Sequence, residues 1–360
     1  MTQRASKTNS LRKQLGMSLI ELLIALVLSL FVVGAVTGIY IVAKKNSVTA
    51  NNIGWMQENA RFALHKIGYD VRMSGYFGEL QQYWNLSETT NPPRQVGTVA
   101  GECFASSTTA IAFRWAIPMI SRDASPQVNV APKILASNDS NTPFSDATNN
   151  CTTAGSALSN YLASTDILST HYFGPNDVAD AALTKDNIYA RTSLQTGVVF
   201  KCQTNGTGCK PPDGPATGMN YPIAAYLYYV SGCGRPGDDG ACGTADDNIP
   251  SLMRVNLQPD GTLLRERVAD GVIDMQIQFG VDTDNDGLAN KYQDSTNDFR
   301  DPTQWATWAT FKTARVWLLM RAREPGYTDP TGAYLYGSAT TVPAANYRYE
   351  LFTTTLTLRN

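Results

Sequence analysis

Three aspartates at alternate positions form the part of this sequence best suited to hold a metal ion. Asp282, Asp284 and Asp286 precede Gly287, and oxygen ligands at alternate positions around a glycine turn are the arrangement that wraps calcium. The candidate ligands are Asp282, Asp284, Asp286, Leu288 through its carbonyl, and Asn290. No other cofactor is expected.

The calcium pattern is incomplete, so two interpretations stay open. An EF-hand loop has a bidentate Glu at its twelfth position, where this chain has Gln293, and Asp294 comes one place late. The segment is therefore either a weak calcium site or a solvated turn that follows a strand. A second acidic stretch, residues 238–248, lacks regular spacing and predicts a solvated loop.

Residues typical of enzymes are sparse. The chain has only two histidines, His65 and His171, and neither has an evident nucleophile partner. His65 lies in a predicted amphipathic helix and His171 in a predicted loop. No phosphate-binding glycine loop, nucleophile elbow or zinc-protease motif occurs. The formal net charge is -2 and no basic patch stands out, so we expect neither catalysis nor nucleic-acid binding.

Six cysteines predict disulfide bonds. They are Cys103, Cys151, Cys202, Cys209, Cys233 and Cys242. Fifteen pairings are conceivable for six cysteines. The pairs closest in sequence, Cys202 with Cys209 and Cys233 with Cys242, close short Gly- and Pro-rich loops and are our first expectation, which leaves Cys103 for Cys151. The alternative is a metal site, but no C-x-x-C pair or Cys/His cluster supports zinc.

The N-terminus predicts a membrane segment. A leader with four basic and no acidic residues, residues 1–16, precedes an apolar run from Met17 to Ala43 whose only charge is Glu21. As a helix this run would measure about 40 Å, more than the roughly 30 Å of a bilayer's hydrocarbon core. The basic leader stays in the cytoplasm by the positive-inside rule, so we expect a single-pass protein with its bulk outside.

At these residues the chain resembles type IV prepilins. The segment Gly16-Met17-Ser18-Leu19-Ile20-Glu21 has the cleavage glycine before the apolar run, whereas a secretory signal places small residues after it. The resemblance implies that a prepilin peptidase cuts after Gly16 and methylates Met17, and that Glu21 acts in subunit assembly. Most members have Phe at the first mature position, so Met17 is a departure. The alternative is a plain signal anchor.

The rest of the chain predicts a helix followed by a β-rich head. Apolar residues at spacings of three and four continue the helix along one stripe, namely Ile53, Met56, Ala60, Leu64, Ile67 and Val71. Strands are expected at 109–115, 224–230, 251–257, 262–268, 272–279, 314–322 and 351–358, and long loops at 79–104 and 121–169. We therefore expect an α+β fold with a leader at 1–16, a helix at 17–75 and an antiparallel β-sheet head at 76–360.

Later segments are similar to the PilW-type minor pilins. They are Glu58–Leu64, Ile249–Arg254, Gly271–Gly280, Arg315–Ala322 and Phe352–Asn360. The resemblance implies a minor pilin that joins other minor pilins in a complex priming type IV pilus assembly at the tip, with the major pilin and a tip adhesin as further partners and roles in adhesion and twitching motility. It implies an inner-membrane protein with a periplasmic head before assembly, and a place at the cell surface afterwards.

Two other functions remain open at this stage. A minor pseudopilin of a type II secretion system shares the N-terminal chemistry, and a membrane-tethered periplasmic enzyme or binding protein is a more distant alternative. The neighbouring genes would distinguish a pseudopilin of a secretion system from a subunit of a pilus. Unchanged function in a Gly16 variant would favour the tethered protein.

Overall fold

The structure is a computed structural model that divides into two compact units, Met1–Ile53 and Gly54–Asn360. It describes residues 16, 18–81, 86–90, 92–94, 96, 99, 134–137, 158–234, 242, 249–294, 311–325, 333–337, 339–341 and 346–358. The boundary between the units lies inside α1 (Leu19–Met73), a helix of 55 residues. The first unit therefore contains the apolar half of α1, and the second contains its other half and all the described strands.

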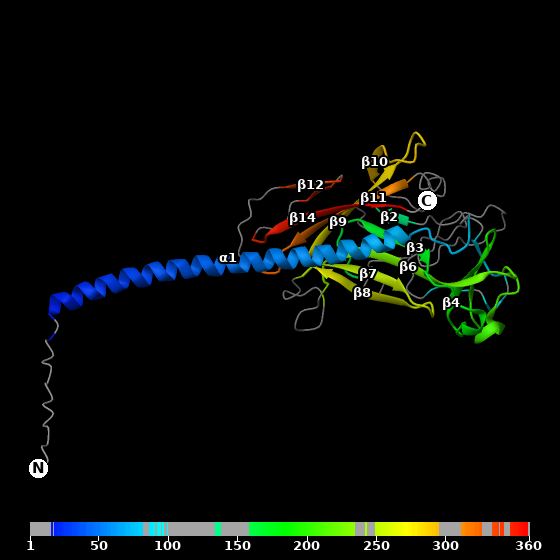
Figure 1. Cartoon of the computed structure of the whole chain (residues 1–360), viewed down its shortest axis with the longest axis horizontal. Helices are drawn as coiled ribbons and strands as arrows, with labels where there is room; N and C mark the ends of the chain where they lie inside the picture. Colours follow the sequence, from blue (N-terminus) through cyan, green and yellow to red (C-terminus); the bar gives the residue numbers. More distant parts are fainter. Residues whose placement is uncertain are drawn as a thin grey trace, which may run out of the picture. The chain divides into compact units, whose positions relative to one another are not determined.

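The apolar half of α1 is drawn in blue in Figure 1 and begins just after Ser18. The Ser18 carbonyl accepts hydrogen bonds from the N–H groups of Glu21 (3.0 Å) and Leu22 (3.1 Å), which closes the first turn. The large apolar side chains from Leu22 to Val42 are between 51% and 74% exposed. By length and composition this half of α1 can cross a membrane, as the hydropathy pattern predicts.

The second half of α1 is amphipathic and packs on the sheets. Its buried residues are Met56, Ala60, Ala63, Ile67, Gly68, Asp70 and Val71, which include four of the six residues of the predicted stripe. Ile53 and Leu64, the other two, are half-buried. The helix ends at Met73, and Gly75 then adopts a positive φ of 86°, a conformation that costs glycine little and suits a helix C-terminus.

The larger sheet has eight strands and is almost entirely antiparallel. Its members are β1 (Leu86–Glu88), β2 (Ile134–Ser137), β3 (Ile167–Phe173), β4 (Ile188–Thr192), β5 (Gly197–Lys201), β6 (Met219–Ser231), β7 (Ser251–Leu257) and β8 (Leu263–Asp270). The main path of the sheet has the order β1-β5-β4-β6-β3-β2. The strand β7 also pairs with β6, and β8 pairs with β7. Among these described strands, only β1 and β5 are parallel. Two 3-10 helices, Asp180–Ala182 and Gly206–Cys209, lie in its connections.

The second sheet is antiparallel with the order β10-β9-β11-β14. Its strands are β9 (Val272–Val281), β10 (Lys291–Asp294), β11 (Phe311–Arg321) and β14 (Tyr349–Thr357), while β12 (Tyr334–Tyr336) and β13 (Ala339–Thr341) form a separate hairpin. In Figure 1 the second half of α1 runs between β14 and β9 on one side and β7 and β8 on the other. Gly68 accordingly faces Leu356 of β14, to which an added Cβ would come within 3.1 Å.

Asp166 joins the two sheets. Its N–H donates to the Met275 carbonyl (2.8 Å), and its Oδ2 accepts from the Ile277 N–H (2.7 Å). Asp166 is fully buried. It thus supplies hydrogen-bond partners to the Met275 carbonyl and the Ile277 N–H of β9, at a place that water does not reach. The segment before β3 in the larger sheet is thereby fixed to the second sheet.

The predicted α+β class is confirmed, and the predicted hairpin at 251–268 is present as β7 and β8. Its turn is closed by the Gln258 N–H donating to the Thr262 carbonyl (2.8 Å), with Gly261 at φ 87°. The strand expected at 109–115 and the acidic stretch at 238–248, apart from Cys242, lie outside the described residues.

The expected loops at 79–104 and 121–169 are wrong in part, because β1, β2 and the start of β3 fall inside them. The strands β4 and β5 were not predicted either. These strands are three to seven residues long, and runs so short carry little periodicity of their own. His171 likewise lies in β3 and is fully buried, with its Nε2 3.4 Å from Ser169 Oγ. Both side chains belong to the core.

Candidate functional sites at the helix start and in an acidic loop

The start of α1 presents a glycine and a carboxylate on an open surface. Gly16 is exposed, and a Cβ added to it would meet no atom of the described residues within 4 Å. Glu21 is exposed in the first helical turn, where the helix dipole favours a negative charge. The spacing Ser18-x-x-Glu21 is also that of a capping box, a sequence signal for a helix start here. Met17 lies outside the described residues.

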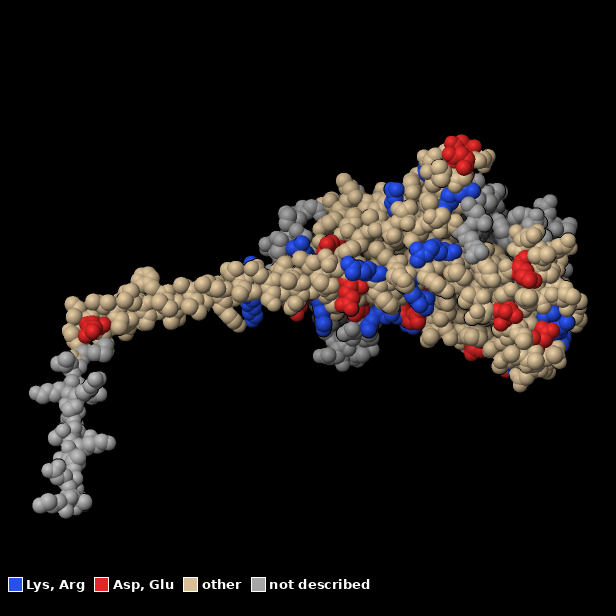
Figure 2. All heavy atoms as spheres, in the orientation of Figure 1, with Lys and Arg blue, Asp and Glu red and all other residues tan. Residues whose placement is uncertain are grey.

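The surface around Glu21 is apolar. Figure 2 shows the apolar half of α1 as a tan stretch with acidic atoms only near its start. In the sequence, Glu21 is the only charged residue between Met17 and Ala43, and the first positive charges after it are Lys44 and Lys45. Exposure of so large a continuous apolar surface to water is unfavourable. Lipid or other apolar helices therefore cover it. A carboxylate in such surroundings requires a cationic partner or a position near the water interface.

A buried polar cluster fixes the second half of α1 to the larger sheet. Asp70 Oδ1 accepts from the Tyr172 hydroxyl (2.8 Å), while Oδ2 accepts from the Tyr228 hydroxyl and lies 3.1 Å from Arg254 Nη1. Arg254 also pairs with Glu266. We name Asp70, Tyr172, Tyr228 and Arg254 the Asp70 cluster.

Burial, followed by the charge of Asp70, raises the pKa of Tyr172 and of Tyr228 far above the ordinary value. Both hydroxyls therefore stay protonated and donate their hydrogen bonds to the carboxylate. Sequence reasoning missed this cluster. Its one local signal is that Asp70 stands three residues after Ile67, on the buried stripe of α1, where an acid needs a partner.

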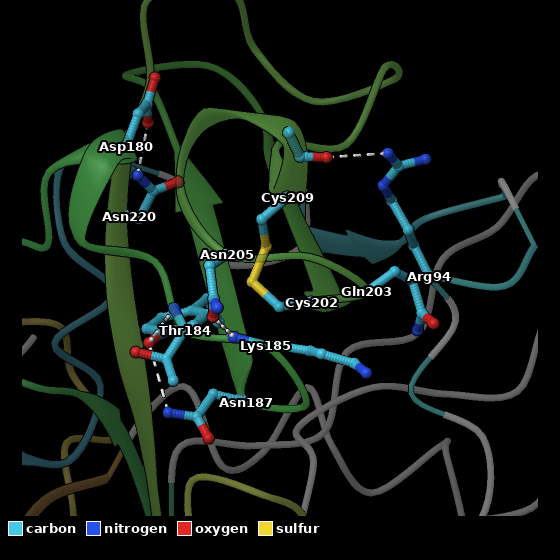
Figure 3. The surroundings of a disulfide bond; sticks show 12 residues. Arg94, Asp180, Thr184, Lys185, Asn187, Cys202, Gln203, Asn205, Cys209 and Asn220 are labelled. Atoms are coloured by element: carbon cyan, nitrogen blue, oxygen red, sulfur yellow. Dashed lines mark hydrogen bonds between the residues drawn. A yellow bond between two sulfur atoms is a disulfide. The ribbon is translucent and has the colours of Figure 1, made fainter.

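Two disulfides lie where the local pairs were expected. Cys202 bonds to Cys209, with Cα atoms 5.0 Å apart, and Cys233 bonds to Cys242. Cys202 and Cys209 are fully buried in a small core with Leu183, Tyr189 and Phe200. Figure 3 shows this bond closing the turn that contains Asn205, whose Oδ1 accepts from the Lys185 N–H (2.7 Å). Cys103 and Cys151 lie outside the described residues.

Loss of the Cys202–Cys209 bond is expected to destabilise the head. The bond closes a loop of eight residues, which corresponds to about 2.5 kcal/mol of chain entropy. The measurement is thermal unfolding of a Cys202→Ala/Cys209→Ala variant. The matched control is Cys233→Ala/Cys242→Ala, since that bond closes a loop of similar size but has an exposed half-cystine. An unchanged unfolding midpoint in Cys202→Ala/Cys209→Ala contradicts the prediction. A smaller effect at 202 and 209 than at 233 and 242 shows that burial of the first bond adds nothing to the effect of loop closure.

The predicted acidic site is the loop of a hairpin. Val281 of β9 pairs with Lys291 of β10, so residues 282–290 connect the strands. One carboxylate oxygen each from Asp282, Asp284 and Asp286 lies within 4.8 Å of the others. The structure therefore brings together the three carboxylates that the spacing singled out.

The other two expected ligands, Leu288 and Asn290, take part in hydrogen bonds within the loop. Asn290 Oδ1 accepts from the Thr283 N–H (3.2 Å) and from its hydroxyl (2.9 Å), which ties the two ends of the loop together. The Leu288 N–H donates to Asp286 Oδ1 (2.7 Å), and the Leu288 side chain is 69% exposed. The Asn290 oxygen is thus already engaged within the loop.

Asp282 is the buried member of the acidic loop, at 4% exposure. Burial acts to raise its pKa, but backbone hydrogen bonds from Gly287 and Asn285 and the charge of Lys312 outweigh it, so the pKa lies below the ordinary value. Lys312 comes from β11 with its Nζ 3.7 Å from Asp282 Oδ2. Asp282 is therefore ionised at neutral pH.

Two family models match the chain, one at each end. A model of the prokaryotic N-terminal methylation motif matches residues 11–37. A model of the type IV pilus-assembly protein PilW matches residues 238–360, which include β7 to β14 and the acidic loop. Comparison with curated proteins gave no match, and neither did comparison with solved structures.

The methylation motif, the exposed apolar helix and the β-rich head define a class, the membrane-anchored, type IV pilus-related pilins that are processed at the N-terminus. Within this class the two matches together support a type IV pilus minor pilin of the PilW type. Such a protein is a structural component of a pilus.

Proposed function

We propose that this chain is a minor pilin that prepilin peptidase cleaves after Gly16 and methylates at Met17, and that then joins other minor pilins to prime pilus assembly at the tip. The observation that carries the proposal is the apolar half of α1, which is exposed along its length and has one carboxylate near its start. In a membrane, lipid covers this surface. In a pilus, the same surface packs against the helices of neighbouring subunits.

The charges of the chain support an inner-membrane precursor with a periplasmic head. The basic leader stays on the cytoplasmic side, so the rest of the chain is exported. Cleavage removes four positive charges and changes the formal net charge from -2 to -6. The two disulfides are of the kind that persists in an oxidising compartment.

Glu21 has a specific role in this proposal. After cleavage the new N-terminal amine of each subunit is a cation in apolar surroundings. An unpaired charge there is unfavourable, so the amine requires an anionic partner. The Glu21 carboxylate of one subunit attracts the amine of a neighbour, either the major pilin or another minor pilin. A tip adhesin is a further partner of the assembled complex.

The test is a Glu21→Ala variant in a strain that depends on it. We expect the variant to be cleaved and to remain in the membrane, but its amount in sheared pili should fall by tenfold or more, since removal of one partner from a buried pair costs several kcal/mol. Immunoblots of membrane and sheared fractions measure both quantities.

The matched control is Ser29→Ala, which truncates a polar side chain that donates to the Leu26 carbonyl within the same exposed segment of α1. This variant should assemble normally. Normal incorporation of Glu21→Ala contradicts the role of Glu21. Co-purification of the wild type with secretion-system components, and not with pilins, overturns the assignment to a pilus.

A further inference from the structure

The β9–β10 hairpin carries a concentrated negative charge. In Figure 2 acidic side chains gather at its tip, at the top of the view, with a basic side chain below them. Asp284 and Asp286 are exposed, and Asp282 lies beneath them at the base of the loop. Three carboxylates so close together repel one another unless a cation lies between them. Lys312 supplies one positive charge, on the side of Asp282 Oδ2.

The two oxygens of Asp282 have different surroundings. Oδ2 accepts from the Gly287 N–H (2.9 Å) and faces Lys312. Oδ1 is buried and accepts no hydrogen bond from any residue that the structure describes. A buried carboxylate oxygen without a donor is unfavourable. A cation bound by Asp282, Asp284 and Asp286 satisfies Oδ1 and also removes the repulsion.

The chemistry of the ligands selects the ion. All available groups are oxygens, which favours a hard cation such as calcium or magnesium and not zinc or copper. The loop wraps around the carboxylates by means of two residues with positive φ, Asn285 (61°) and Gly287 (91°). Such an irregular oxygen set suits calcium, which accepts six to eight ligands in flexible geometry, better than magnesium, which demands a near-ideal octahedron.

We infer that the loop from Asp282 to Gly287 binds a calcium ion through Asp282 Oδ1 and one oxygen each of Asp284 and Asp286, with water completing the shell. The ion fixes the β9–β10 hairpin at the edge of the second sheet. Binding itself does not depend on the proposed function. Occupancy at millimolar calcium outside the cell does rest on export of the head.

The first measurement is titration of the full chain in detergent with calcium chloride, by calorimetry. With three carboxylates and no bidentate Glu, we expect one site with a Kd of about 10⁻⁴ to 10⁻³ M. The second measurement is thermal unfolding in excess calcium and in chelator. At about 30 times the Kd, calcium should raise the midpoint by roughly 3 °C for a head of this size.

The variant is Asp284→Asn, which keeps the size of an exposed side chain while it removes one ligand charge. We expect its calcium affinity to fall at least about tenfold, and its midpoint in chelator to equal or exceed that of the wild type because repulsion is relieved. The matched control is Asp260→Asn in the β7–β8 turn, where Asp260 Oδ1 accepts from the Thr262 N–H and hydroxyl. It should keep the full calcium-induced shift.

Three results overturn the inference. The first is no heat of binding and equal midpoints of the wild type in calcium and chelator. The second is a calcium-induced shift that persists in Asp284→Asn, which places the ion elsewhere. The third is equal binding of magnesium, which contradicts the selection of calcium. None of these results bears on Glu21, so the proposed function is judged separately.

Discussion

An Asp70→Ala variant is expected to unfold about 5 to 8 °C below the wild type. The substitution removes the acceptor of two buried hydroxyls, Tyr172 and Tyr228, and one of the two anionic partners of Arg254. Breaking a buried ion pair by deleting one partner costs about 3 to 5 kcal/mol. For a head of this size, such a loss of unfolding free energy lowers the midpoint by the amount given above. The measurement is thermal unfolding of the full chain in detergent, followed by circular dichroism.

The matched control is Glu266→Ala, which removes the other anionic partner of the same guanidinium. The Glu266 side chain is 36% exposed, whereas that of Asp70 is 2% exposed. Water replaces an exposed partner, so the control should cost no more than about 1 kcal/mol. Equal midpoints for Asp70→Ala and Glu266→Ala would show that the Asp70 cluster does not hold α1 on the sheet.

A Gly16→Leu variant is expected to remain unprocessed, so that the full-length chain with its leader accumulates in the membrane. A peptidase that cuts after a glycine approaches the backbone closely there, and a bulky side chain prevents this approach. The structure separates that effect from misfolding, because an added Cβ at Gly16 meets no atom within 4 Å in the part of the chain that the structure describes. The loss of mature protein should be nearly complete, as judged by the intact mass of the purified chain.

Gly34→Leu is the matched control for processing. Gly34 lies in the apolar half of α1, which begins three residues after Gly16, and an added Cβ there also meets no atom of the described residues within 4 Å. This variant should be cleaved at the normal position. If Gly16→Leu yields a chain that begins at Met17, cleavage after Gly16 is not the processing step. If both variants stay uncleaved, the effect is a general one of the apolar segment.

The sequence by itself determined the elements whose signals are local. The apolar run after Gly16 predicts a helix that can span a membrane because composition and length alone decide that property. The stripe through Met56 and Val71 predicts an amphipathic helix because neighbours three and four residues apart share one face. The alternate spacing of Asp282 and Asp286 likewise brings their carboxylates together within a single turn.

Only the tertiary structure decided the contacts between distant segments. Asp70 meets Tyr228 and Arg254 across more than 150 residues, and the burial of His171 depends on the strands on both sides of β3. The contact between Asp282 Oδ2 and Lys312 depends on β11, which brings Lys312 to the acidic loop. Such contacts form only when the whole core closes, because the loss of chain entropy on joining distant segments is recovered by burial of many residues together. A local sequence pattern depends only on residues a few positions apart, so it does not predict contacts with distant segments.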